Sequence, residues 1–150
     1  MVSEGVVKTP FVMAITSGKG GVGKSVLASN IAYALSLLGN KVLLWDANRG
    51  FPNCHLLLGV DPPIRLSEVY RGLVSVEKAV HNISNSNLYL LSDIPGGGMN
   101  LDDETLNFLD VYKDLLLETD FDAVIIDSPA GYNEATIEIA NVADEIHIMI

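Results

Sequence analysis

Short apolar runs alternate along this chain with longer segments in which apolar residues recur at helical spacing. Most of the short runs are apolar throughout, which is typical of strands buried on both faces of a parallel sheet. We therefore predict strands at Phe11 to Ile15, Val42 to Trp45, Leu88 to Leu91, Ala123 to Ile126 and Ile146 to Ile150.

The longest helical pattern follows the first predicted strand. From Lys24 to Leu38, apolar residues recur at spacings of three and four, which predicts one buried face of a helix, and Gly39 is expected to end it. This predicted face consists of Leu27, Ile31, Leu35 and Leu38. Further helices are predicted at Leu66 to Arg71, Val76 to Val80, Leu106 to Leu117 and Glu134 to Val142.

Strands that alternate with helices predict an α/β fold, a three-layer sandwich with a mainly parallel sheet and right-handed crossovers. A flexible loop is expected from Ser92 to Asp103, where Pro95 to Gly98 interrupt the pattern. The fifth predicted strand ends the sequence at Ile150 and would leave an apolar sheet edge uncovered. We therefore expect the sequence to be the front part of a longer protein.

A glycine-rich segment lies between the first predicted strand and the first predicted helix, the context that a phosphate-binding loop requires. Residues 18 to 25 read Gly-Lys-Gly-Gly-Val-Gly-Lys-Ser. Its glycines allow successive backbone N–H groups to point at a phosphate, and the helix start adds the positive end of its dipole. Lys24 offers a charge to the β- and γ-phosphates, and the Ser25 hydroxyl is placed to bind Mg²⁺. The alternative is a plain strand-to-helix turn with a surface lysine.

Two acidic residues follow apolar strands, where α/β sheets gather their ligand groups. Asp46 follows Val-Leu-Leu-Trp, and Asp127 follows Ala-Val-Ile-Ile. Both are candidate partners of a magnesium-bound triphosphate, and the alternative for each is an aspartate that caps a turn.

Composition narrows the class of protein. With 150 residues, 49% hydrophobic and 19% charged, the chain suits one globular domain. The net charge of −10 argues against general nucleic-acid binding. The single cysteine, Cys54, excludes an internal disulfide, which suits a reducing cytoplasm. Cys54 and Trp45 are both predicted to be core residues. His55, His81 and His147 show no metal-ligand spacing, and no run of 18 apolar residues predicts a membrane span.

The glycine loop holds a second lysine, Lys19, beside Lys24. This doublet resembles the deviant Walker A motif of the ParA/MinD family of dimeric ATPases. The resemblance covers about residues 11 to 150 and implies that residues 1–150 are the N-terminal part of one ATPase domain. Trp45 to Gly50, with Asn53 and Leu56 to Gly59, look like the first switch region of MinD and its flagellar relative FlhG (FleN), and Asp127 to Gly131 look like the Walker B motif and second switch.

The resemblance implies ATP or ADP and Mg²⁺ as cofactors, and a homodimer in which two subunits enclose two ATP molecules. Lys19 would reach across to the partner's nucleotide, Gly131 would let the second switch respond to the γ-phosphate, and the metal would be held by Ser25, Asp46 and Asp127. A regulatory protein partner is also implied, as is membrane binding from the cytoplasm through a C-terminal segment beyond Ile150. The implied nucleotide-binding residues are Gly18, Lys19, Gly20, Gly21, Val22, Gly23, Lys24, Ser25, Val26, Asp46, Asp127 and Gly131.

One position departs from the family's pattern. The family usually has Asp-x-Asp after the second strand, with the second Asp orienting the attacking water, whereas this chain has Asp46-Ala47-Asn48. An amide can hold a water but cannot accept its proton. The expected catalytic residues are Lys19, Lys24 and Asn48, and hydrolysis is expected to be impaired while ATP binding is kept.

Several functions remain open from the sequence. An ATP-switched ATPase that controls the placement or number of a cellular structure is the leading hypothesis, and Gly50 to Gly59 with Leu66 to Gly72 favour a flagellar role over a division-site role. Asn48 allows a non-hydrolysing ATP-binding scaffold. An iron-sulfur ATPase similar to nitrogenase reductase or Mrp needs cysteine pairs, and this sequence has one cysteine.

Overall fold

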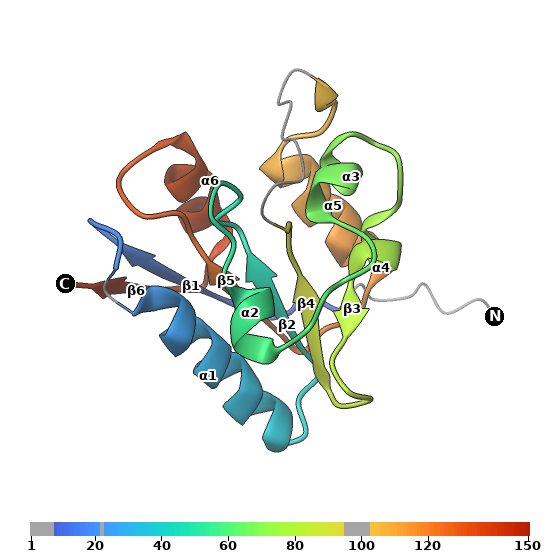
Figure 1. Ribbon diagram of the computed structural model, residues 1–150, viewed down its shortest axis with the longest axis horizontal. Coiled ribbons are helices and arrows are strands. Elements are labelled where there is room, and N and C mark those ends of the chain that lie inside the picture. Colours follow the sequence, from blue (N-terminus) through green and yellow to red (C-terminus); the bar gives the residue numbers. More distant parts are fainter. Residues whose placement is uncertain (1–7, 22, 95–102) are drawn as a thin grey trace.

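A six-stranded sheet with helices on both faces forms the protein (Figure 1). The computed structural model describes residues 8–21, 23–94 and 103–150. Its elements, in chain order, are β1 (Phe11–Ser17), α1 (Lys24–Leu37), β2 (Val42–Asp46), α2 (Cys54–Leu58), α3 (Leu66–Tyr70), α4 (Val76–Ala79), β3 (His81–Asn82), β4 (Leu88–Leu91), α5 (Phe108–Glu118), β5 (Ala123–Asp127), α6 (Glu134–Val142) and β6 (Glu145–Met149).

The strand order is β3-β4-β2-β5-β1-β6. Only the short β3 pairs antiparallel, with β4; the other described pairs are parallel. The prediction of an α/β sandwich with a mainly parallel sheet is therefore confirmed. Because parallel strands end at the same side of a sheet, the loops after β1, β2 and β5 come together there.

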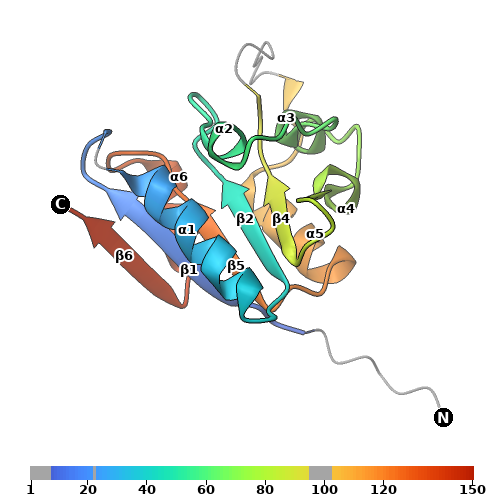
Figure 2. The same ribbon diagram turned by 60° about the horizontal axis from the view of Figure 1, so that its bottom comes forward.

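Alternate strand residues separate the core into two layers. On β2, Val42 and Leu44 pack in the layer with Ala28 and Ala32 of α1, whereas Trp45 lies in the layer with α3 to α6. Figure 2 shows α1 crossing one face of the strands. All five β2 residues are buried, so the apolar run from Val42 to Trp45 follows from burial on both faces. Trp45 is a core residue, as predicted.

The buried face of α1 differs from the predicted one. Ala28 and Ala32 are fully buried, whereas Leu27, Ile31 and Leu35 are only partly buried and Leu38 is 79% exposed. Small side chains let α1 approach the sheet closely, and the larger ones pack at the sides of this contact. The period was therefore predicted correctly, but the face was rotated by about one residue.

The remaining differences are at short elements and ends. The sequence pattern missed α2 and β3, and it placed the start of α5 two residues early, at Leu106. The expected Ser92–Asp103 loop lies mostly outside the described residues. Within the described part of the chain, no helix combines the length and apolar character needed to cross a bilayer.

Candidate phosphate-binding site

The glycine loop begins where β1 ends. The hydroxyl of Ser17, the last β1 residue, donates to the carbonyl of Lys19 at 2.7 Å. Gly21 and Gly23 have φ values of +73° and +84°, in the left-handed region that residues with a Cβ rarely occupy. Gly23 is the N-cap of α1, and no side chain caps the helix there. The loop thus leads its backbone into a helix start as the sequence predicts, and Val22 lies outside the described residues.

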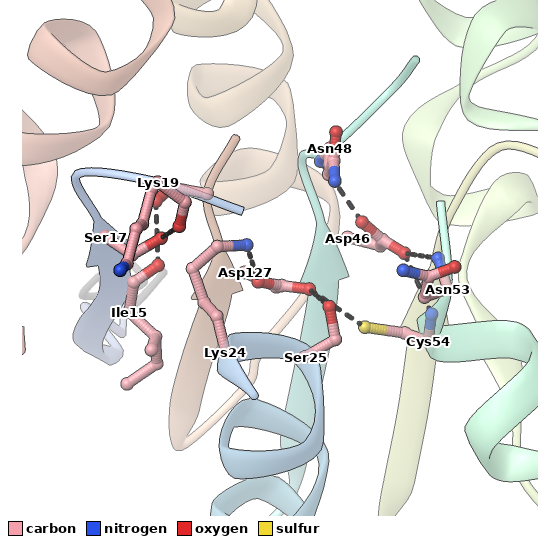
Figure 3. A network of polar contacts seen from close by, with 11 residues as sticks. Ile15, Ser17, Lys19, Lys24, Ser25, Asp46, Asn48, Asn53, Cys54 and Asp127 are labelled. Carbon is pink, nitrogen blue, oxygen red and sulfur yellow. Dashed lines mark hydrogen bonds and ion pairs between the residues drawn. The ribbon is translucent and has the colours of Figure 1, made fainter. Parts of the chain in front are cut away.

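The Asp127 carboxylate is the centre of a buried polar network (Figure 3). Lys24 Nζ donates to Asp127 Oδ1 at 2.7 Å, and Ser25 Oγ donates to Oδ2 at 2.6 Å. The side chains of Lys24 and Asp127 are 7% and 0% exposed. A charge buried this deeply is stable only with a close partner, so the first turn of α1 and the end of β5 are held together by this pair.

Asp46 lies beside Asp127, in register with it across β2 and β5. Its Oδ1 accepts the backbone N–H of Asn48 at 3.1 Å, and its Oδ2 accepts those of Asn53 and Cys54 at 2.9 and 3.0 Å. Burial raises the pKa of Asp46 to about 6, assisted by the negative charge of Asp127 and opposed by the three N–H donors. Asp46 therefore holds the loop between β2 and α2 in place.

Cys54 contributes a contact that the sequence did not indicate. It is buried, as predicted, but its Sγ also lies 3.4 Å from Asp127 Oδ2. Burial raises the pKa of the Cys54 thiol, and the two nearby aspartates raise it further, so the thiol stays protonated and can donate. The sulfur and one carboxylate oxygen each from Asp46 and Asp127 lie within 4.8 Å of one another. No signal in the sequence placed Cys54 here, because α2 is too short to show a periodicity.

A cavity of about 290 Å³ opens beside this network. Asn48 lines it from the β2–α2 loop, and Val26 lines it from α1. Leu56 and Leu57 also line it and are 67% and 49% exposed. The full lining is Gly20, Gly21, Gly23, Lys24, Ser25, Val26, Asn48, Asn53, Leu56, Leu57 and Ala130. Most of the predicted loop residues, and Asn48, thus share one pocket.

Gly18, Lys19 and Gly131, which were also predicted, do not line this pocket. Gly131 follows β5, has a φ of +88°, and donates its N–H to the Ser17 carbonyl at 2.8 Å, which ties the loop after β5 to the end of β1. Gly18 and Lys19 are exposed. Gly18 lines a neighbouring cavity between α6 and the β1–β6 edge.

The donors around the cavity suit a phosphate together with a hard cation. A helix start, a lysine and a glycine loop favour an anion. Hydroxyl and carboxylate oxygens are the ligands that Mg²⁺ prefers. Ser25 and Asp127 supply such oxygens next to the lysine, whereas the Asp46 oxygens are already engaged by three backbone N–H groups. We therefore expect Asp46 to act on a cation from behind Asp127.

Comparisons with known proteins agree with this geometry. A family model described as an AAA domain matches residues 11–150. The septum site-determining protein MinD of Thermotoga maritima is 40% identical over 125 residues, which cover 80% of this chain and 44% of the relative. The antiactivator FleN of Pseudomonas aeruginosa is 27% identical over 150 residues, covering 93% of this chain and 50% of the relative.

A solved structure matches the fold. The septum site-determining protein MinD from Pyrococcus horikoshii, in complex with Mg-ADP, superposes with a TM-score of 0.82 at 29% identity. The match covers 94% of this chain and 58% of that one. The chain therefore spans about half the length of the curated relatives it matches.

Proposed function

This chain belongs to the ParA/MinD family of P-loop ATPases, and from this membership we propose that it binds ATP or ADP with Mg²⁺ and works as an ATP-switched dimeric ATPase. The observation that carries the proposal is the convergence of Lys24 and Ser25, two adjacent residues at the start of α1, on the buried carboxylate of Asp127. A structural ion pair alone would not require a glycine loop around it.

In the proposed complex, the backbone of Gly20 to Gly23 binds the β-phosphate. Lys24 would turn from Asp127 to the phosphates, and the Ser25 hydroxyl and the Asp127 carboxylate would hold the cation. Mg²⁺ would neutralise negative charge on the phosphates. Asp46 supports this arrangement from behind by fixing the loop that carries Asn48 to the pocket.

The switch itself requires a second subunit. Lys19 is exposed on the loop while Lys24 is buried, so the two lysines are suited to different tasks. We infer that Lys19 reaches the partner's nucleotide and neutralises charge that develops there. The exposed Leu56 and Leu57 at the pocket would be covered in the dimer, and Gly131 would respond to the γ-phosphate through the loop after β5.

The cellular role is to place a structure or set its number. The sequence favours a flagellar role and the resemblance to FleN supports it, while the 40% identity to a MinD favours division-site placement as the second candidate. Loss of the gene would alter flagellar number in the first case and the position of division in the second. A regulatory protein partner and membrane attachment from the cytoplasm, through a segment beyond Ile150, belong to the same proposal.

Calorimetric titration of the full chain with Mg-ATP tests nucleotide binding. Lys24→Ala should lower ATP affinity by about ten- to a hundredfold, because it removes a charge-assisted contact to the phosphates, which typically contributes about 1.5–3 kcal/mol. Lys78→Ala, at an exposed lysine of α4, is the matched control and should bind like the parent. Equal affinities for Lys24→Ala and the parent would refute the phosphate-site assignment.

A further inference from the structure

Arg49 immediately follows Asn48 in the loop between β2 and α2, and the two side chains line different cavities. Asn48 lines the phosphate-site cavity. Arg49 lines a second cavity of about 350 Å³ on the other side of the loop, together with Tyr70, Glu104 and Glu138. Arg49 therefore faces away from the nucleotide site, and its guanidinium is not placed to contact the phosphates directly.

The guanidinium of Arg49 has three separate partners. Its Nε donates to Asp93 Oδ2 at 3.2 Å, and its Nη2 donates to Glu104 Oε1. Its central carbon lies 4.0 Å from the centre of the Tyr70 ring, a cation–π geometry. Arg49 is 16% exposed at its side chain and Asp93 is 4% exposed, so water does little to screen these contacts.

The partners are themselves fixed by the backbone of other elements. Asp93, which follows β4, also accepts the Ser67 N–H at 2.5 Å through its Oδ1. The Tyr70 carbonyl accepts the N–H groups of Thr105 and Leu106, next to Glu104, at 2.9 and 3.0 Å. The end of β4, helix α3 and the segment before α5 thus form one rigid receptor for the Arg49 side chain.

Only the planar guanidinium of an arginine can make all of these contacts at once. One donor meets Asp93 and another meets Glu104 while the plane rests on an aromatic ring, and a lysine ammonium cannot do all three. Asp46 fixes the same loop from the inside, through the backbone N–H groups of Asn48 and Asn53. The loop that presents Asn48 is therefore held from both sides, by a carboxylate toward the site and by an arginine away from it.

We propose that Arg49 is a positioning residue for the nucleotide site: its side chain fastens the β2–α2 loop to Asp93 and Glu104 and so sets the place of Asn48 at the γ-phosphate. This inference rests on the proposed function, because the γ-phosphate position belongs to it. Removal of the fastening leaves the phosphate loop and Lys24 intact, so it affects the step that depends on Asn48 and spares the contacts that ADP makes.

Three variants of the full chain test the proposal. Arg49→Met keeps the length of the side chain and removes its charge. Glu104→Gln weakens the fastening while Asp93 still has its partner, and it serves if Arg49→Met folds poorly. Arg71→Met is the matched control, since Arg71 is exposed at the end of α3. Amide hydrogen exchange of residues 47–54, ADP affinity by calorimetry and single-turnover ATP hydrolysis are measured well below the melting temperature of each variant.

In Arg49→Met, we expect faster hydrogen exchange at the amides of Asn48 and Asn53. ATP turnover should be at least about tenfold slower, because a reacting group is misplaced. ADP affinity should stay within about threefold of the parent. Glu104→Gln should shift exchange and turnover in the same direction by less, and Arg71→Met should change nothing. Unchanged exchange in Arg49→Met overturns the proposal. A fall of ADP affinity in step with turnover overturns it too, since the pocket as a whole is then disturbed.

The exchange measurement separates this inference from the proposed function. If the parent neither binds nor hydrolyses ATP, the proposed function fails. Comparison of amide hydrogen exchange at residues 47–54 between Arg49→Met and Arg71→Met still shows whether Arg49 fastens the loop.

Discussion

At the residue scale, we expect Asn48 to limit the rate of the proposed reaction. It lines the phosphate cavity, and its own backbone N–H is held by Asp46 Oδ1 at 3.1 Å. The amide keeps one acceptor oxygen of an aspartate but loses the negative charge and the ability to take a proton. The position is therefore suited to hold a water and poorly suited to activate it.

The change Asn48→Asp should raise ATP turnover by at least about tenfold, a threshold set below the roughly 10² to 10⁴ that general-base catalysis contributes. ATP affinity should stay near that of the parent, because Lys24 and the loop carry the phosphate contacts. Phosphate release in single-turnover experiments measures the rate, and calorimetry measures the affinity. An unchanged rate at equal affinity would show that position 48 does not act on the water.

Individual residues also show where sequence reasoning stops. Lys24, Ser25 and Asp127 were assigned to one site from their motifs alone, and the structure brings them within hydrogen-bond distance. The motif fixes such residues because each follows directly from a strand or opens a helix. The contacts of Cys54 and Arg49 could not be assigned, because no motif specifies them and they depend on the path of the loop between β2 and α2.

At the scale of elements, strand β2 and helix α2 are joined through one carboxylate. Asp46, the last residue of β2, accepts the N–H groups of Asn53 and Cys54 at the start of α2. Three backbone donors do not fully offset the loss of water around this buried carboxylate, so the pKa of Asp46 rises from 3.8 to about 6. The link between the two elements therefore depends on pH.

The sign of this dependence follows from the raised pKa of Asp46. The folded state holds the proton more tightly than the unfolded chain, so the Asp46 contribution to stability is fully present below pH 3.8 and is lost as pH rises through about 6. The shift of about two units corresponds to roughly 3 kcal/mol at most. The free energy of unfolding of the parent, relative to Asp46→Asn, should fall by up to this amount between pH 4 and pH 7.

Denaturant titrations of both proteins across this range provide the measurement. The difference between the two proteins cancels the titration of other carboxyl groups, such as Asp120 and Asp122, whose pKa values are lowered by Lys41 and Lys8 respectively. A difference that stays constant with pH would contradict the assignment of this pKa to Asp46.

Elements with a strong local pattern were predictable, and short ones were not. The strands β2, β4 and β5 are almost wholly buried and are apolar apart from the final aspartates of β2 and β5, and this signal survives in the sequence alone. Strand β1 is only partly buried, but it too begins with an apolar run. Helix α2 has five residues and β3 has two, too few for a period to appear. The face of α1 was misplaced because close packing on the sheet selects Ala28 and Ala32 over larger apolar residues nearby.

At the scale of the whole molecule, the proposed switch depends on association of two chains. Exposed groups suit such an association: Lys19 on the glycine loop, and Leu56 and Leu57 at the phosphate-site cavity. Because Lys24 occupies the buried position beside Asp127, we expect Lys19 to act between subunits and not on the phosphates of its own site. Substitution of Lys24 should therefore weaken ATP binding, whereas substitution of Lys19 should weaken association of the two chains.

The change Lys19→Ala should abolish ATP-dependent dimerisation of the full-length protein and leave ATP affinity of the monomer within about threefold of the parent, since an exposed lysine contributes little within its own subunit. Light scattering with ATP and with ADP measures the association. Lys78→Ala is again the control. If Lys19→Ala dimerises at the same ATP concentration as the parent, the proposed role of Lys19 at the partner's nucleotide is wrong.

The pair of Lys24 and Asp127 has a thermodynamic consequence for the order in which ligands arrive. An anion that binds alone must draw Lys24 away from Asp127 and leave a fully buried carboxylate without a counter-charge, while a cation that binds alone must displace Lys24 and Ser25 from it. Anion and cation together meet both requirements at once. The two ligands are therefore expected to bind with positive cooperativity, and the coupling is reciprocal: each raises the affinity of the other by the same factor. Free phosphate or free magnesium is then a weak competitor, and the site responds to the metal–nucleotide complex as a unit.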